Sequence, residues 1–332
     1  MPPSLDAGSS GPAVRTLGAT GLVVSRIGLG LAAVGRPAYI TTDRDDDLGD
    51  DRSVEAMEQR AHAVLDAAYD AGVRYVDAAR SYGYAERFLA SWLERRGAVV
   101  TVGSKWGYTY VADWRLDTEV NEVKEHSLGA LRRQYAESRE ILGDHLALYQ
   151  IHSATLESGV LGDDAVLREL ARLRGEDGLT IGLSTSGTRQ AETVRRALEV
   201  LVDGVNPFST VQSTWNVLEP SVGAALAEAH DAGWGVLVKE ALANGRLASE
   251  PPSAITEVAD VHHVTPDRIA IAAVLSQPWV DVCLSGAVTE RQIRSNAAAL
   301  EVSLTDGELD RLIGVAEAAE SYWLMRSKLP WR

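Results

Sequence analysis

The sequence predicts an α/β fold, a single (β/α)8 TIM barrel, from two observations. Short β-prone segments alternate with longer segments whose apolar residues recur with a helical period, which is the pattern of strand-helix units around a parallel sheet. Eight β-prone segments follow one another, and eight is the strand number of this barrel. The predicted strands are Arg26–Leu31, Val73–Asp77, Val99–Ser104, Leu146–Ile151, Leu179–Leu183, Thr210–Gln212, Gly235–Val238 and Val280–Leu284.

Helical periodicity predicts the outer layer of the barrel. The predicted helices are Met57–Ala71, Val123–Arg133, Ala165–Arg174, Thr188–Leu201, Val222–Ala232 and Arg268–Gln277. Ahead of the first strand, VRTLGATGLVVSRIG is typical of a β-hairpin, which we expect to plug the bottom of the barrel. After the eighth unit, Thr305 and Glu308 predict a capping box at the start of a C-terminal helix, followed by a tail through Trp331.

Length and charge narrow the class of protein. The 332 residues suit one barrel or two average domains, but no boundary is visible, so 1–332 is interpreted as one domain with residues 1–12 loosely ordered. No apolar run reaches the roughly 18 residues that span a bilayer, and the N-terminus lacks the pattern of a signal peptide. We therefore expect a cytoplasmic protein. A net charge of −15 argues against nucleic-acid and membrane partners.

Several polar features predict no chemistry of their own. The Asp-rich stretch in Gly35–Arg52 lacks the ligand spacing of a calcium loop, so we expect a solvated loop on one rim. His262 and His263 have no partners at metal-ligand spacing, and no metal site is predicted. Cys283 lies in the apolar run VDVCL and is expected in a buried strand.

A dinucleotide-binding motif of another fold is present only in outline. Gly28, Gly30 and Ala33 match the loose pattern G-x-G-x-x-A directly after a strand. That motif must open straight into a helix whose N-terminus faces the pyrophosphate, whereas Pro37 and a polar loop follow here. We therefore reject a Rossmann fold.

Four polar residues stand at or just after the ends of consecutive predicted strands. Asp77 and Tyr82 follow the second strand, Lys105 the third and His152 the fourth. The loops at the carboxyl ends of barrel strands form one mouth, so these residues are expected to converge. Each alone would suit a structural role, as a cap, a loop residue, a surface charge or a rim histidine. Four together favour an acid-base site.

Such a site suits the reduction of a carbonyl group. A cofactor supplies hydride, and a side chain must protonate the developing alkoxide. Tyr82 is the predicted acid, and Lys105 is the cation expected to lower its pKa from about 10. Asp77 would keep Lys105 charged and oriented, and a neutral His152 would donate to the substrate oxygen.

The segment VDAARSYGYAE resembles the signature of the aldo-keto reductase superfamily, in which an Asp is followed by Ala and by Tyr-Gly. The likeness continues through VGSKWG, LYQIHS, IGLSTSG, VQSTWNVLEP, GWGVLVKEALANGRLA and LSGAVTERQIRSN, in the family's order. It extends from about Val14 to Asn296 and into the C-terminal helix. The resemblance implies a (β/α)8 barrel with NADP(H), or alternatively NAD(H), across its mouth, and it gives the four residues at the strand ends the roles described above.

The resemblance also implies which residues hold the cofactor. Ser184 and Gln212 would hold the nicotinamide carboxamide, while Lys239–Gly245 and Ser285–Asn296 would hold the pyrophosphate and the adenosine. The implied cofactor residues are Ser184, Thr185, Gln212, Lys239, Glu240, Leu242, Gly245, Ser285, Gly286, Gln292 and Asn296. Independently, phosphate sites in such barrels favour the loops after the seventh and eighth strands.

Two departures from the family pattern lie near the nicotinamide. Thr185 stands where Asn is common, and it lacks the amide of Asn. Lys239 stands where many members place an aromatic that stacks on the nicotinamide, with Glu240 where Ser is usual. A stacking surface would then have to come from Trp215 or Trp106.

A third departure lies at the adenosine end. Gly286 and Gln292 stand where some members place Lys and Arg on the 2′-phosphate. Arg291 or Arg294 would then supply the charge. NADP(H) remains the expected cofactor, with NAD(H) as the alternative.

The expected activity is NADP(H)-dependent reduction of a small aldehyde or ketone to an alcohol, or the reverse. The alternatives are an oxidative sugar or alcohol dehydrogenase of the same family, and a regulatory, channel-subunit-like protein that senses the cofactor with little turnover. A metal-dependent hydrolase is disfavoured, because no predicted strand ends in paired histidines. Trp106, Tyr108 and Trp323 are predicted to line the substrate pocket, with core packing as the alternative. The sequence predicts no oligomeric state.

Overall fold

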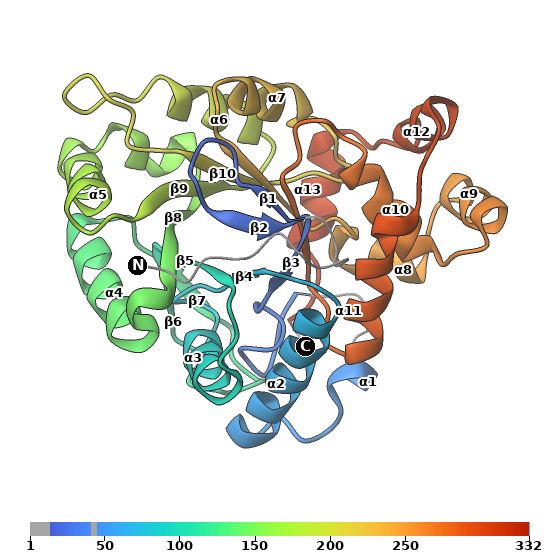
Figure 1. Ribbon diagram of the computed structural model, residues 1–332, viewed down its shortest axis with the longest axis horizontal. Coiled ribbons are helices and arrows are strands. Elements are labelled where there is room, and N and C mark those ends of the chain that lie inside the picture. The colour runs from blue at the N-terminus through green and yellow to red at the C-terminus, as the bar shows by residue number, and fades with distance from the viewer. Residues whose placement is uncertain (1–13, 41–44, 332) are drawn as a thin grey trace.

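Eight parallel strands close into a barrel in the computed structural model, which describes residues 14–40 and 45–331 (Figure 1). The strands are β3 (Ile27–Gly30), β4 (Tyr75–Asp77), β5 (Thr101–Trp106), β8 (Leu146–Ala154), β9 (Thr180–Thr185), β10 (Thr210–Thr214), β11 (Gly235–Lys239) and β12 (Val282–Ser285). Strands adjacent along the chain pair with one another, and β12 pairs with β3 to complete the ring. The eight predicted strands are confirmed, whereas the expected loose order of residues 1–12 lies outside the described residues.

Helices cover the outside of this barrel (Figure 1). They are α1 (Asp45–Leu48), α2 (Val54–Asp70), α3 (Ala85–Arg96), α4 (Leu128–Leu142), α5 (Asp164–Glu176), α6 (Gln190–Leu198), α7 (Gly223–Asp231), α8 (Arg246–Ser249), α9 (Ser253–His262), α10 (Pro266–Leu275), α11 (Glu290–Ala297), α12 (Asp306–Ile313) and α13 (Ala319–Ser327). α5 illustrates why they form. Asp163 caps its first turn, and Val166, Leu170 and Leu173 recur on one buried face.

The helices differ from the sequence-based prediction in two respects. Several of them were not predicted, for example α3, although its apolar residues, Trp92 among them, are buried. The helix predicted over Val123–Arg133 begins only at Leu128. Its first residues instead form β7 (Glu122–Lys124), which pairs with β6 (Tyr108–Tyr110) in an antiparallel hairpin. The helical period of the apolar residues did not distinguish the second strand of this hairpin from the helix that follows it in the chain.

An N-terminal hairpin closes one end of the barrel, as predicted. Strand β1 (Val14–Thr16) pairs with β2 (Val23–Ser25), and the hairpin lies across the barrel in Figure 1. Leu17 and Val24 are fully buried in one apolar cluster with barrel residues that include Tyr75. The interior is therefore sealed at the amino ends of the strands, which leaves the carboxyl ends for a site.

In its described residues, 35–40 and 45–52, the loop Gly35–Arg52 is solvated only in part, because Asp50 and Asp51 are exposed as its composition predicted but the start of the loop is not. Its first residues, Gly35 to Ala38, are buried, and the Arg36 side chain is only 2% exposed. Arg36 Nη1 donates to Glu122 Oε2 at 2.9 Å and to the Ser81 carbonyl at 3.0 Å. These partners satisfy the guanidinium, so a polar loop can turn inward.

The C-terminal region contains the predicted capping box and helix. Thr305 Oγ1 accepts from Glu308 N, while Glu308 Oε2 accepts from Thr305 N, at the start of α12. Helix α13 follows, and the tail then reaches Trp331, which forms an isolated bridge with Ile40. The tail therefore ends beside the loop that follows the first barrel strand.

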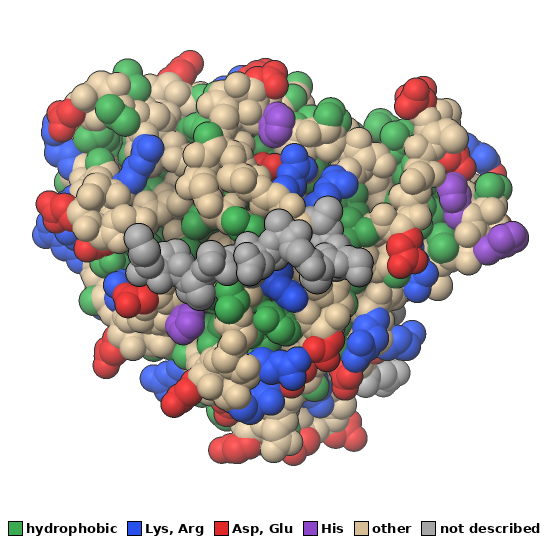
Figure 2. Space-filling view, viewed as in Figure 1, with side chains coloured by type: hydrophobic (Ala, Val, Ile, Leu, Met, Phe, Trp, Pro, Cys, Tyr) green, Lys and Arg blue, Asp and Glu red, His purple; other side chains and the backbone are tan. Residues whose placement is uncertain are grey.

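Charges on the face shown in Figure 2 are interspersed rather than gathered by sign. Within residues 14–40 and 45–331, no helix is long and apolar enough to cross a membrane, and no group of three potential ligands could hold a metal ion. His262 instead meets Glu308 at 2.9 Å. Cys283 is buried, as predicted, and burial raises the pKa of its thiol to about 12.

Packing inside the barrel predicts the effect of one methyl group. A Cβ at Gly182 would lie 2.0 Å from Thr210 Oγ1, so Gly182→Ala should lower the free energy of unfolding by about 1–3 kcal/mol. Gly162→Ala is the control, because Gly162 is exposed and its added Cβ would meet no atom within 4 Å. The midpoint of urea denaturation measures the stability of each variant. Equal midpoints for the two variants would contradict the close packing of Gly182 against Thr210.

Candidate active site

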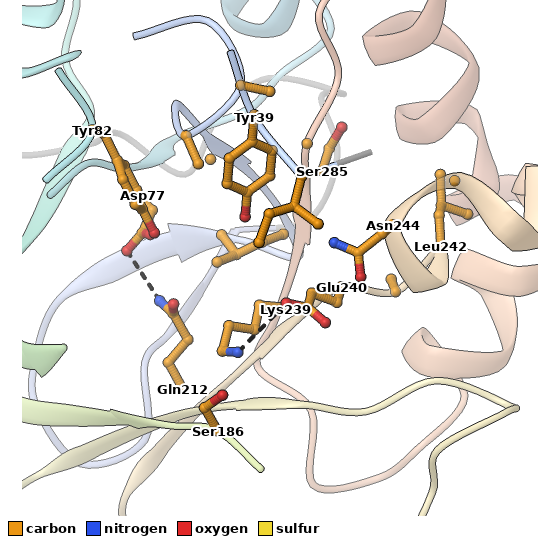
Figure 3. A pocket seen from close by; sticks show the side chains of 18 of the residues that line it. Tyr39, Asp77, Tyr82, Ser186, Gln212, Lys239, Glu240, Leu242, Asn244 and Ser285 are labelled. Atoms are coloured by element: carbon orange, nitrogen blue, oxygen red, sulfur yellow. Dashed lines mark hydrogen bonds and ion pairs between the residues drawn. The ribbon is translucent and has the colours of Figure 1, made fainter. Parts of the chain in front are cut away.

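The four predicted acid-base residues converge at the carboxyl mouth of the barrel. Asp77 ends β4, Tyr82 follows in the next turn, and Lys105 and His152 lie near the ends of β5 and β8. Asp77, Tyr82 and His152 line one cavity. Figure 3 shows Tyr82 and Asp77 together, with Gln212 joined to Asp77 by a hydrogen bond. Lys105 is 1% exposed and lies behind this lining.

The carboxylate of Asp77 connects several barrel strands. Lys105 Nζ donates to Asp77 Oδ2 in a buried ion pair. Asp77 Oδ1 accepts from Tyr75 OH at 3.1 Å, from Gln150 Nε2 at 3.3 Å and from Gln212 Nε2 at 3.0 Å. A buried charge is tolerated only where it is paired and hydrogen-bonded, and this carboxylate satisfies both conditions.

Tyr82 lies beside two cations. Lys105 Nζ is 3.4 Å from the Tyr82 hydroxyl oxygen, and the Arg36 guanidinium carbon is 5.2 Å from the centre of the ring. Burial, followed by the Asp77 charge, raises the pKa of Tyr82, and Arg36 opposes this shift. The net direction is opposite to the lowering expected from Lys105, and burial of the hydroxyl is its largest cause. Tyr82 therefore keeps its proton near neutral pH.

His152 is held as a neutral ring above the same cavity. Its ring packs edge-on against Tyr82 at 5.4 Å and Tyr108 at 5.0 Å, between ring centres. Ser81 Oγ is 3.4 Å from His152 Nδ1. Desolvation by the surrounding protein, followed by the Lys105 charge, lowers the pKa of His152 well below its usual range. The imidazole is thus uncharged near neutral pH and retains one N–H donor.

A second group of charges lies at the end of β11. Lys239 Nζ donates to Thr214 Oγ1 at 2.8 Å and lies 3.9 Å from Glu240. Arg326 of α13 pairs with the same Glu240 carboxylate. Burial lowers the pKa of Lys239 to about 8. Burial alone would raise the pKa of Glu240, but Arg326 and Lys239 outweigh it and lower that pKa to about 2.

The cavity continues from these charges toward the loop after β12. Ser285 and Gly286 line it, and a Cβ at Gly286 would meet no atom within 4 Å. The Asn296 amide lies 2.8 Å from Ser285 Oγ, and both residues are buried. Open space beside glycine, with buried polar groups and nearby cations, suits a long anionic ligand such as a nicotinamide dinucleotide.

Most predicted cofactor residues line this cavity, but some do not. Gln212, Lys239, Glu240, Leu242, Gly245, Ser285, Gly286 and Asn296 line it, and Gln292 lines a second cavity that adjoins it. Ser184 Oγ instead accepts from Ser153 N at 2.8 Å, and Thr185 Oγ1 lies 2.7 Å from Ser213 Oγ. The hydroxyls of Ser184 and Thr185 are therefore engaged within the protein, and Ser153 and Ser186 form the cavity wall there.

The predicted substrate residues divide in the same way. Tyr108 lines the cavity, whereas Trp106 is fully buried and Trp323 is 9% exposed within an apolar cluster of the C-terminal region. Trp106 and Trp323 lie outside the described lining, as does Trp215, which packs against Trp279. For Trp106 and Trp323 the core-packing alternative agrees with the structure, and the stacking surface expected from Trp215 or Trp106 is not part of the cavity lining.

Sequence reasoning missed one wall of the cavity. Arg36, Tyr39, Glu122 and Trp331 line it, and the Arg36 guanidinium carbon lies 4.8 Å from the ring centre of Tyr39 and 4.6 Å from that of Trp331. These residues come from three separate segments, and none belongs to a motif. The sequence had indicated the loop Gly35–Arg52, the stretch after Trp106 and the tail around Tyr322–Trp331 as the segments that decide the substrate, but it singled out none of these four residues.

The fold and this site define a (β/α)8 barrel with an acid-base centre at the carboxyl ends of its strands. A model of the Aldo/keto reductase family matches residues 26–317, and the chain belongs to that family. The pyridoxal 4-dehydrogenase of Microbacterium luteolum is 24% identical over 88% of this chain and 94% of its own length. The NADH-specific methylglyoxal reductase of Escherichia coli is 24% identical over 92% of this chain and 98% of its own.

Solved structures agree with this assignment at the level of the fold. An aldo-keto reductase from Bacillus halodurans, in its holo form, superposes with a TM-score of 0.69. It is 20% identical in sequence and covers 93% of this chain and 99% of its own. The homologues named above are oxidoreductases, which supports an oxidoreductase here.

The Asp77–Lys105 pair predicts non-additive effects on stability. Lys105→Met leaves a buried carboxylate without its cation and should lower the free energy of unfolding by about 3–5 kcal/mol. Asp77→Asn combined with Lys105→Met removes both charges and should be more stable than Lys105→Met alone. Denaturant unfolding of the two single variants and the double variant measures the coupling. A double variant as unstable as the sum of the singles would show that the pair is not coupled.

Proposed function

We propose that the protein transfers hydride between a nicotinamide dinucleotide and the carbonyl or alcohol carbon of a small molecule, with Tyr82 as general acid or base. The observation that carries this proposal is the placement of the Tyr82 hydroxyl, which lines the cavity 3.4 Å from the buried Lys105 ammonium and beside a neutral His152. A proton donor, its cation and a neutral hydrogen-bond donor are the groups that carbonyl reduction requires.

The cofactor, when bound, supplies or accepts the hydride. Tyr82 gives its proton to the substrate oxygen as negative charge develops there, and Lys105 stabilises the resulting tyrosinate. Asp77 holds Lys105 in place from behind. His152 donates a hydrogen bond to the same substrate oxygen and thereby fixes its approach to Tyr82. In the reverse direction, the Tyr82–Lys105 pair accepts the proton of an alcohol.

The raised pKa of Tyr82 is compatible with this role. A protonated tyrosine is the form needed for reduction, and burial keeps it protonated. The shift would hinder proton release without a nearby cation, and Lys105 and Arg36 both adjoin the ring. These two cations interact most strongly with Tyr82 when it carries a negative charge. They therefore stabilise the tyrosinate formed during proton transfer more than the resting tyrosine.

The cavity supports a dinucleotide whose reactive end faces Tyr82. Gln212 is a carboxamide donor and acceptor that lines the cavity beside Asp77, and Figure 3 shows Lys239 close to it. Gly245 and Gly286 would border the pyrophosphate in the loops after the seventh and eighth barrel strands. NADP(H) is the cofactor that the family resemblance implies, and the residues at the adenosine end decide between NADP(H) and NAD(H).

Tyr82→Phe tests the proposed acid directly. We expect its kcat to fall by roughly 10²–10⁴, the usual contribution of a positioned general acid, with the affinity for reduced cofactor unchanged. The assay follows reduced nicotinamide by absorbance with a panel of small aldehydes and ketones, and alcohol oxidation in reverse. Tyr135→Phe is the matched control, because Tyr135 donates to Asp177 on the surface and does not line the cavity.

Two outcomes would change the proposal. Full turnover by Tyr82→Phe would remove Tyr82 as the acid. Cofactor binding by the wild type without turnover in either direction would favour a protein that senses the cofactor. The pair of assays separates these cases, because binding and turnover are measured on the same samples.

Lys239 predicts a pH dependence of cofactor affinity. Its pKa is lowered to about 8, so the cation is present below that pH and lost above it. Because the dinucleotide is anionic, its affinity should fall by roughly fivefold, or about 1 kcal/mol, as pH rises through this range. Glu240, with a pKa of about 2, and Arg326 remain charged throughout. The Lys239→Met variant should bind the dinucleotide with an affinity that does not change with pH over this range. A variant whose affinity still falls as that of the wild type does would contradict this role of Lys239.

A further inference from the structure

A second cavity adjoins the first beyond the loop that follows β12. The two cavities share Leu242, Gly245 and Asn296. If the reactive ring lies at Tyr82 and the phosphates lie at the loops after the seventh and eighth strands, the adenosine half extends into this second cavity. Asp47 of α1 and Gln292 of α11 both line it.

The side chain of Gln292 has a fixed orientation. Its Oε1 accepts from Val288 N at 2.9 Å and from Thr289 N at 3.2 Å, which completes the capping box of α11. The amide nitrogen must therefore face away from the backbone, and Nε2 donates to Asp47 Oδ2 at 2.6 Å. The helix cap thus anchors a carboxylate at the cavity wall.

The other charged side chains that line this cavity either lie near an opposite charge or are exposed to solvent. Arg268 Nε lies 3.4 Å from Ser295 Oγ, and the Ser295 hydroxyl donates to Asp267 at 2.8 Å, so opposite charges share one serine. Arg291 and Arg294 also line the cavity, but both are exposed, and solvent screens exposed charges. Asp47 is half-buried and acts at shorter range.

We propose that Asp47, anchored by Gln292, makes this site selective for NAD(H) over NADP(H). NAD(H) and NADP(H) differ only in the 2′-phosphate of the adenosine ribose. A carboxylate accepts hydrogen bonds from ribose hydroxyls and repels a phosphate at the same position. Gln292 presents an uncharged amide, so it offers the phosphate no compensating cation. The proposal rests on the proposed function, because it assumes that a nicotinamide dinucleotide occupies the joined cavities.

Equilibrium binding of NADH and NADPH to the purified protein tests this selectivity without any substrate. Quenching of tryptophan fluorescence provides the signal, since the chain contains 8 tryptophans. We expect NADH to bind at least roughly tenfold more tightly than NADPH, a difference of about 1.4 kcal/mol. Asp47→Asn keeps the size and one acceptor but removes the charge, and it should reduce that ratio by roughly tenfold, mainly through tighter NADPH binding.

Two further variants make the test specific. Asp50→Asn is the control, because Asp50 follows in the same segment but is exposed and outside the second cavity lining. It should leave the ratio unchanged. Gln292→Arg places a guanidinium beside Asp47 and should strengthen NADPH binding without any change at Asp47 itself. Thermal melts of each variant distinguish lost selectivity from lost folding.

Each outcome separates this inference from the proposed function. Tighter binding of NADPH by the wild type would overturn the role of Asp47 and show that the arginines of the cavity prevail. An unchanged ratio in Asp47→Asn would also overturn it. In both cases the dinucleotide still binds, and the proposed hydride transfer stands. If neither NADH nor NADPH binds the wild type, the proposed function itself fails.

Discussion

The buried ion pair of Asp77 and Lys105 is the interaction on which the mouth of the barrel depends. One carboxylate receives donors from β4, β5, β8 and β10, through Tyr75, Lys105, Gln150 and Gln212. Strands that do not pair directly are thereby fixed relative to one another at the depth where the cavity begins. The pair is costly to bury and costly to break, so the local geometry around Tyr82 tolerates little variation. The same contacts that stabilise the barrel set the distance between Lys105 and Tyr82.

Electrostatic pairing also organises the walls above this ion pair. Arg36 meets Glu122 on one side, and Arg326 meets Glu240 on another. Each wall is therefore close to neutral, although charged residues line it. Lys239 is the exception, because its amine lies 3.9 Å from Glu240 and burial lowers its pKa to about 8. The described lining of the cavity is thus close to neutral overall. Lys239 is the cation in this lining whose charge changes near pH 8, and it can attract an anionic ligand below that pH.

The sequence predicted the barrel and the four acid-base residues because both follow from local rules. Strand periodicity identifies eight strands, and residues at strand ends must share the mouth. The wall of Arg36, Glu122 and Trp331 was not predictable in this way. Its residues come from a loop, a hairpin and the C-terminal tail, and only tertiary packing brings them together. Trp106 was misjudged for a related reason, since a strand residue beside Lys105 faces the opposite side of the sheet and is buried there.

The hairpin at the amino end of the barrel has a consequence for proton traffic. Leu17 and Val24 seal that end, and Tyr75 joins their apolar cluster to the Asp77 carboxylate. In the described part of the chain, water therefore reaches Tyr82 from the cavity side. A tyrosinate formed during reduction must be reprotonated through the space that the ligands occupy. The departing product and the incoming proton then use the same route. The product must leave before Tyr82 recovers its proton, so product release limits the rate of reprotonation.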